Sequence, residues 1–175
     1  MVGDIATVFG REWLLLSRRL GKFMLSRMIA PLLYLIAFGW GIGRSIPMNG
    51  GSYLDFIVPG IMALNAMNIS FNSVGGPLHT SRMFTKNLEE YLVAPISPLS
   101  FVIGELVAGV LRGVLSSVVI LVLAYAFGAH IQVGAAFVGI LVLNCLVFAA
   151  MGFAVAMLID GHEEMGNFST YVLLP

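Results

Sequence analysis

The chain has 175 residues, of which 59% are hydrophobic and only 10% are charged, and its nine basic and nine acidic residues give no net charge. Soluble domains carry about 25% charged residues, so this composition excludes an ordinary soluble globular protein. The balanced charge argues against a surface that binds nucleic acid, and the single cysteine excludes a disulfide framework.

Residues 1–23 are expected to form an amphipathic helix on a membrane surface. Apolar side chains such as Trp13 are interspersed with charged ones such as Arg11, so this segment is too polar to cross a bilayer. Trp13 and the adjacent Arg18 and Arg19 are typical of a helix that lies flat at the lipid headgroups. A soluble helical tail is the alternative interpretation.

Four later segments are long and apolar enough to cross a bilayer, which takes roughly 20 helical residues. They are residues 24–42, 54–74, 101–127 and 134–159, and a further apolar segment, 168–175, resembles the start of a fifth span. A span that stopped inside lipid would leave backbone polar groups unpaired, so the chain is expected to be a fragment or truncated form of a longer protein. The predicted fold is an all-α integral membrane protein with one transmembrane domain over residues 1–175.

Lysine and arginine predict which loops face the cytoplasm, because these residues are enriched there. Arg44 alone falls in the loops on one side of the predicted spans. The opposite side has seven basic residues: Arg11, Arg18, Arg19, Lys22, Arg27, Arg82 and Lys86. We therefore expect the N-terminus and the loop between the second and third spans to lie in the cytoplasm.

That cytoplasmic loop is predicted to contain a short helix over residues 79–93, which ends before Pro95. Phe84, Leu88 and Leu92 recur every four residues and form an apolar stripe, whereas Glu89 and Glu90 fall outside it. A solvated helix has no need of such a stripe, so it should dock on another surface. The membrane, the underside of the protein and a groove on a partner are all open as that surface.

Polar residues occur inside two of the spans. Asn65, Asn68 and Asn72 form one stripe in the second span, and Glu105 and Arg112 share a face of the third. Charged residues inside a membrane face protein or water rather than lipid, so the two polar faces are expected to meet, with Arg112 near the depth of Asn65 and Glu105 near that of Asn72. They would form either a lining of the transport path or a buried polar clamp between the helices.

Gly109 and Gly113 form a G-x-x-x-G pattern that lets membrane helices approach closely. The sequence has no phosphate-binding loop and no set of residues typical of a catalytic site, and its three histidines are scattered among loops. We therefore expect neither an enzyme nor a metal site, and any energy source must lie in another chain or in an ion gradient.

Read in order, these features resemble the type-2 permeases of ABC exporters along essentially the whole chain. The most specific part is the segment EEYLVAP at 89–95 followed by Arg112 and Gly113. The other matching pieces are PLLYL at 31–35, FIVPG at 56–60, Asn68, Asn72, Ser97, Pro98, Gly104, Gly109 and the segment 168–175.

The resemblance implies six spans in the complete fold, a homodimer in a bacterial plasma or inner membrane, and a separate ABC ATPase that binds the ATP. It also implies that the helix 79–93 is the coupling helix, with Phe84, Leu88 and Leu92 docking on the ATPase and Glu89 and Glu90 pairing with its basic residues. Two alternatives come from other classes. One is a gradient-driven carrier or channel that uses Glu105, and the other is a membrane scaffold that transports nothing.

Overall fold

The computed structural model describes residues 2–18, 20–42, 53–85 and 97–173, and every regular element in these ranges is helical. The helices in chain order are α1 Val2–Ser17, α2 Leu20–Ile36, η1 Ala37–Ile42, α3 Tyr53–Thr80, η2 Ser81–Thr85, α5 Pro98–Ala126, α6 Ala135–Leu158 and α7 His162–Leu173. The segments η1 and η2 are wider π-helical turns that extend α2 and α3 at their C-terminal ends. The predicted all-helical class is therefore confirmed.

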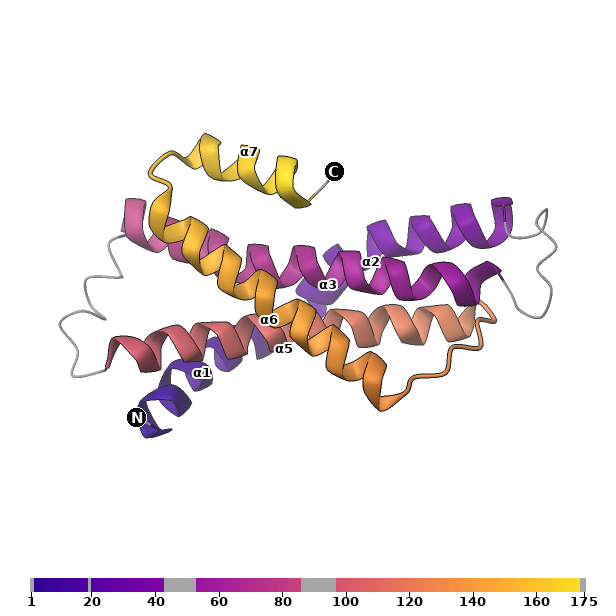
Figure 1. The fold of residues 1–175 in the computed structure, drawn as a ribbon, viewed down its shortest axis with the longest axis horizontal. Helices are drawn as coiled ribbons and strands as arrows, with labels where there is room; N and C mark the ends of the chain where they lie inside the picture. Colours follow the sequence, from indigo (N-terminus) through magenta and orange to yellow (C-terminus); the bar gives the residue numbers. More distant parts are fainter. Residues whose placement is uncertain (1, 19, 43–52, 86–96, 174–175) are drawn as a thin grey trace.

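Helices α3 and α5 run in opposite directions along the length of the molecule, and α6 crosses them at an angle (Figure 1). Helix α3 lies at the centre, because its most extensive contacts are with α6 and α5. Helix α1 packs along α5, and α2 contacts both α5 and α3. The last helix, α7, turns back after α6 and contacts α3.

Three described helices are long and apolar enough to cross a membrane: Tyr53–Met83, Pro98–Ala126 and Ala135–Leu158. They correspond to the predicted spans 54–74, 101–127 and 134–159. The segment predicted as the first span, 24–42, is helical as α2 and η1, and α7 begins at His162, before the predicted start at 168. The count of four spans and the start of a fifth stays a prediction.

Helix α5 has well-defined ends that its sequence explains. Ser97 is the N-cap, and its side chain accepts a hydrogen bond from the backbone N–H of Ser100, while Pro98 occupies the first turn, where no N–H is needed. At the other end the N–H of Ala129 donates to the carbonyl of Ala124, and Gly128 adopts a φ of 86°. This is the Schellman arrangement, which needs a residue in the left-handed region.

Replacing Gly128 with alanine is expected to destabilise the chain by about 1–2 kcal/mol, because an L-residue is strained at this positive φ. The measurement is the melting temperature of the detergent-solubilised chain. Gly60→Ala is the control, since its added Cβ in α3 would meet no atom within 4 Å. Equal melting temperatures for the two variants would contradict the assigned turn.

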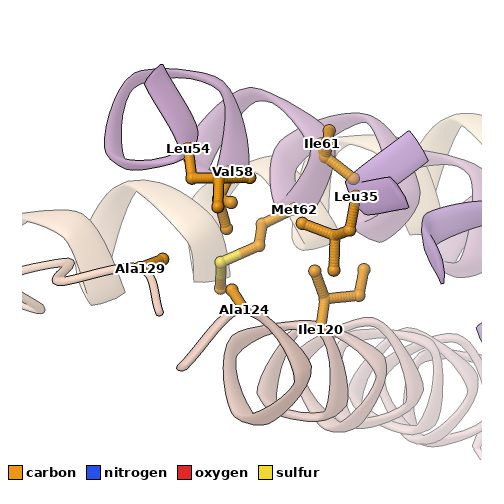
Figure 2. Close-up of a cluster of buried hydrophobic side chains, with 8 residues drawn as sticks. All are labelled: Leu35, Leu54, Val58, Ile61, Met62, Ile120, Ala124 and Ala129. Carbon is orange, nitrogen blue, oxygen red and sulfur yellow. The ribbon is translucent and has the colours of Figure 1, made fainter. Parts of the chain in front are cut away.

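One end of the bundle is filled by a cluster of buried hydrophobic side chains (Figure 2). Its members come from α2, α3, α5 and the turn after α5: Leu35, Leu54, Val58, Ile61, Met62, Ile120, Ala124 and Ala129. The same turn is tied to α3, because the N–H of His130 donates to a carboxylate oxygen of Asp55 over 2.6 Å. This cluster holds α2 against the α3–α5 pair.

The outer face of α6 is apolar as well. Ile140, Leu143, Val147 and Leu158 are all more than half exposed, although leucine, isoleucine and valine are normally buried in soluble proteins. A helix that exposes such residues along its whole length is suited to contact with lipid.

Candidate functional site

A cluster of charged side chains lies where α1, α5 and α3 meet, near the middle of α5. Arg112 of α5 donates from Nη2 to Oε2 of Glu12 in α1 over 2.5 Å. The two side chains are each only 11% exposed, so water screens this ion pair little. Glu12 therefore fastens α1 to the middle of α5. The position of residues 1–23 on the membrane surface stays a prediction.

The other terminal nitrogen of Arg112, Nη1, donates to the backbone carbonyl of Ser73 over 2.9 Å. This carbonyl is special because residue 77, four positions later in α3, is a proline. Proline has no N–H, so Ser73 lacks the donor that normally completes the helical hydrogen bond. Arg112 supplies that donor from a neighbouring helix and thus stabilises α3 at its proline.

Glu105 lies two turns before Arg112 on α5 and is 9% exposed. It is within electrostatic range of Glu12, Arg112 and Arg11, and Arg11 itself pairs with Glu12 over 3.1 Å. Two carboxylates and two guanidinium groups thus share one region and balance in formal charge. Burying charges in such a compensated group costs less than burying any one of them alone.

The three asparagines of α3 turn to other partners. The amide Nδ2 of Asn65 donates to Oγ of Ser116 on α5 over 2.6 Å. Asn68 and Asn72 donate to carbonyls one turn earlier in α3, and Oδ1 of Asn72 accepts from Oγ of Ser169 in α7 over 3.4 Å. Of this stripe, Asn65 alone has a described hydrogen bond to α5.

The register of α3 against α5 differs from the predicted one by about one helical turn. The sequence suggests that Asn65 lies at the depth of Arg112, whereas the structure places Asn65 at Ser116, four residues further along α5. The close contacts of the two helices agree with this register, because a Cβ added at Gly109 would lie against Val74 and one added at Gly113 against Ser70. Arg112 consequently faces the carbonyl of Ser73.

Gly109 and Gly113 lie on the face of α5 that contacts α3 and α6. A Cβ added at Gly113 would lie 2.2 Å from Oγ of Ser70 and 2.7 Å from Sγ of Cys145, and one at Gly109 would lie 2.5 Å from Cγ2 of Val74. These distances leave no room for a side chain. The G-x-x-x-G pattern thus occurs where three helices approach most closely.

A second polar contact, which was not predicted from the sequence, lies at the C-terminal end of α3. Arg82 in η2 donates from Nη1 to the carbonyls of Ala156, Met157 and Ile159 over 3.2, 2.6 and 3.4 Å. Its Nη2 donates to Oδ1 of Asp160 over 2.6 Å. The available signal was that Arg82 and Asp160 both follow apolar segments on the same predicted side, but Lys86, Glu163 and Glu164 do so too.

Most of the predicted coupling residues cannot be placed. Leu88, Glu89, Glu90 and Leu92 lie outside the described residues, and Phe84 is described only as part of the backbone of η2. The start of the predicted helix 79–93 coincides with the end of α3 and with η2. Among the described residues, no group of three or more His, Cys, Asp or Glu side chains is placed to hold a metal ion.

Comparison with known proteins identifies the family. The model of the ABC-2 type transporter family matches residues 4–175, which is nearly the whole chain. The chain belongs to the ABC-2 type transporter family. The membership that its residue pattern predicts is thereby confirmed.

Curated relatives agree with this assignment. The inner membrane transport permeases YadH of Escherichia coli strain K12 and of Shigella flexneri are each 30% identical over 149 residues, covering 84% of this chain and 58% of the relative. Nodulation protein J of Azorhizobium caulinodans is 25% identical over 174 residues, covering 97% of this chain and 68% of the relative. The chain thus spans 58% of the length of YadH. No solved structure matches the chain.

Proposed function

We propose that this chain is the membrane-spanning part of an ATP-driven exporter and that a separate ATPase subunit binds and hydrolyses the ATP. The ABC-2 family membership and the printed role of YadH, an inner membrane transport permease, support this function and an inner-membrane location. The permease works as a homodimer in the lipid bilayer, with no role for nucleic acid. Its N-terminus faces the cytoplasm, which the distribution of lysine and arginine supports.

The loop between α3 and α5 is the docking site for the ATPase in this proposal. Its apolar stripe of Phe84, Leu88 and Leu92 binds a groove on the ATPase, and Glu89 and Glu90 pair with basic residues there. The observation that carries the proposal is the placement of this loop between two long, antiparallel helices that pack closely through Gly109 and Gly113. A displacement of the loop reaches both helices directly because they are continuous with its ends.

The polar cluster around Arg112 acts in this proposal as a clamp rather than as a lining of the transport path. Both terminal nitrogens of Arg112 are engaged, one by Glu12 and the other by the carbonyl of Ser73. These two of its five N–H donors hold the guanidinium between α1 and α3, which is the arrangement that a clamp requires. The clamp would keep α1, α3 and α5 together while the loop end moves.

The test is co-purification of the whole permease from its native membrane, comparing the natural chain with Leu88→Asp. A carboxylate within the apolar stripe must be desolvated on docking, so we expect at least a tenfold loss of the bound ATPase, equivalent to about 1.4 kcal/mol. Asn87→Asp is the matched control, because it adds the same charge one residue away and off the stripe. Full retention of the ATPase by Leu88→Asp, or its absence from the natural chain, would refute the proposal.

A further inference from the structure

We propose that Arg82 is a positioning residue that joins α6 to the loop end of α3, so that movement of the loop 86–96 carries α6 along with α3. This inference rests on the proposed function, because it assigns a route by which movement at the ATPase docking site spreads through the membrane helices. Arg82 lies in η2, shortly before that loop, whereas α6 lies more than 40 residues further along the chain.

Arg82 contacts the C-terminal end of α6, which attracts a positive charge. The last carbonyls of a helix have no N–H partner within the helix, and they carry the negative end of its dipole. Helix α6 ends at Leu158, and the guanidinium of Arg82 binds the carbonyls of Ala156, Met157 and Ile159 around that end. The positive charge of Arg82 and the partial negative charge of the helix end attract each other.

The guanidinium group of Arg82 binds two groups at the end of α6 at once. Nη1 is directed to the carbonyls of α6, and Nη2 is directed to the carboxylate of Asp160, so one planar group binds both the helix end and the residue that follows it. Arginine presents its donors in a rigid fork, whereas lysine offers a single point charge. The fork therefore restricts the orientation of α6 as well as its distance from η2.

Buried apolar side chains lie beside the contact of Arg82 with α6. Leu78 of α3, Ala156 of α6 and Met165 of α7 form a buried cluster beside it, and Phe101 of α5 meets Phe153 of α6 edge-to-face at 6.2 Å between ring centres. The end of α6 thus packs against apolar side chains, which do not fix its position along their surface. Arg82 adds directional hydrogen bonds that do fix it. The side chain of Arg82 is 29% exposed and that of Asp160 is 75% exposed, so water screens the ion pair more than the bonds to the carbonyls of α6.

Arg82 lies in the π-helical turn η2, which positions its side chain. Such turns are rare and often occur at functional sites, because they widen the helix and redirect its side chains. Ser81–Thr85 extends α3 as this wider turn, and Arg82 is its second residue. The turn brings the guanidinium to the end of α6, close to the last described residue before the segment 86–96.

The test measures whether α3 and α6 stay together when nucleotide is bound. Spin labels are placed on cysteines at Thr80 and Leu158, two exposed positions near the ends of α3 and α6, in a Cys145→Ala background. The distance between the labels is measured by electron paramagnetic resonance in the purified permease–ATPase complex, without nucleotide and with ATP and vanadate. We expect the same distance in both states when Arg82 is present.

Arg82→Gln is expected to make this distance depend on nucleotide, with a shift of about 2 Å or more between the two states. A purely structural cap would change the distance equally in both states, so the difference between states isolates the positioning role. Arg82→Lys should give an intermediate shift, and Asp160→Asn, which keeps the carbonyl contacts, should give a smaller one. Arg18→Gln removes the same charge from an exposed position in the same chain and should give none.

Two failures can be told apart. If no ATPase co-purifies with the natural chain, the proposed function fails and this inference falls with it. If the ATPase is bound but Arg82→Gln shows the same label distance in both states, the proposed function stands and Arg82 has no positioning role. A nucleotide-dependent distance already in the natural chain would also overturn the inference, since α3 and α6 would then move separately.

Discussion

Replacing Arg112 with leucine is expected to destabilise the folded chain by about 3 kcal/mol or more, since the buried carboxylate of Glu12 would keep only the half-exposed Arg11 as a charged partner. The change removes the partner of the Glu12 carboxylate and also the donor to the carbonyl of Ser73. That carbonyl has no replacement from its own helix, because residue 77 is a proline. Glu105 would at the same time lose its nearest described positive neighbour on α5.

The measurement is the melting temperature of the detergent-solubilised permease, which should fall by about 6–12 °C for a loss of this size. Arg11→Gln is the matched control, because it removes a guanidinium from the same charged group. Its side chain is 50% exposed, so water screens its charge and we expect a change within about 1 kcal/mol. A similar fall in melting temperature for both variants would mean that burial does not increase the contribution of Arg112 to stability.

A double-mutant cycle separates the ion pair from the bond to Ser73. Glu12→Gln alone leaves Arg112 with its carbonyl partner, whereas Arg112→Gln leaves the buried carboxylate of Glu12 with only the half-exposed Arg11, so the second change should be the more damaging. Combining them should cost at least about 1 kcal/mol less than the sum of the two single changes, as is usual for residues in direct contact. Strict additivity would show that Glu12 does not hold α1 to α5.

The apolar spans were predictable because their signal is local. A helix that crosses a bilayer needs a run of apolar residues, and the runs near 54–74, 101–127 and 134–159 each correspond to an observed helix. The C-terminal limit of α3 was less predictable, since Ser73, Gly75 and Pro77 resemble a loop. In the structure the helix continues through them, because α5 and α6 pack against this segment and Arg112 supplies a missing hydrogen bond.

The polar contacts were only partly predictable for a different reason. Composition and spacing place Glu105 and Arg112 on one face of a membrane helix, but they do not reveal which of several polar groups will face them. The asparagine stripe of α3 was a reasonable partner, yet Glu12 of α1 occupies that place. From the sequence, Arg82 predicts only that its loop faces the cytoplasm. Its main partners are backbone carbonyls, and because every residue has one, the sequence does not single them out.

Replacing Gly152 with alanine is expected to destabilise the contact of α6 with α3 by about 1–3 kcal/mol, the usual cost of inserting a methyl group into a packed core. An added Cβ would lie 2.5 Å from the carbonyl oxygen of Phe71 and 3.1 Å from its carbonyl carbon and Cα. All three are backbone atoms, so no side-chain rotation can relieve the overlap. Helices α3 and α6 would have to separate.

Gly139→Ala provides a control on the same helix, because its Cβ would meet nothing within 4 Å. Alanine favours a helix more than glycine does, so this change should stabilise the chain by about 0.5–1 kcal/mol. The two variants make the same chemical change in one helix and are predicted to shift the melting temperature in opposite directions. A rise for both would show that α6 does not approach Phe71 closely.

Gly75→Ala completes the series at the same crossing. Its Cβ would lie 2.8 Å from Cε of Met165, the flexible end of a side chain, and 3.1 Å from the carbonyl oxygen of Gly152. Met165 can move aside more readily than the backbone of Phe71, so the loss should be smaller than for Gly152→Ala. The order of melting temperatures, with Gly139→Ala highest and Gly152→Ala lowest, tests the close approach of the two backbones rather than the volume added.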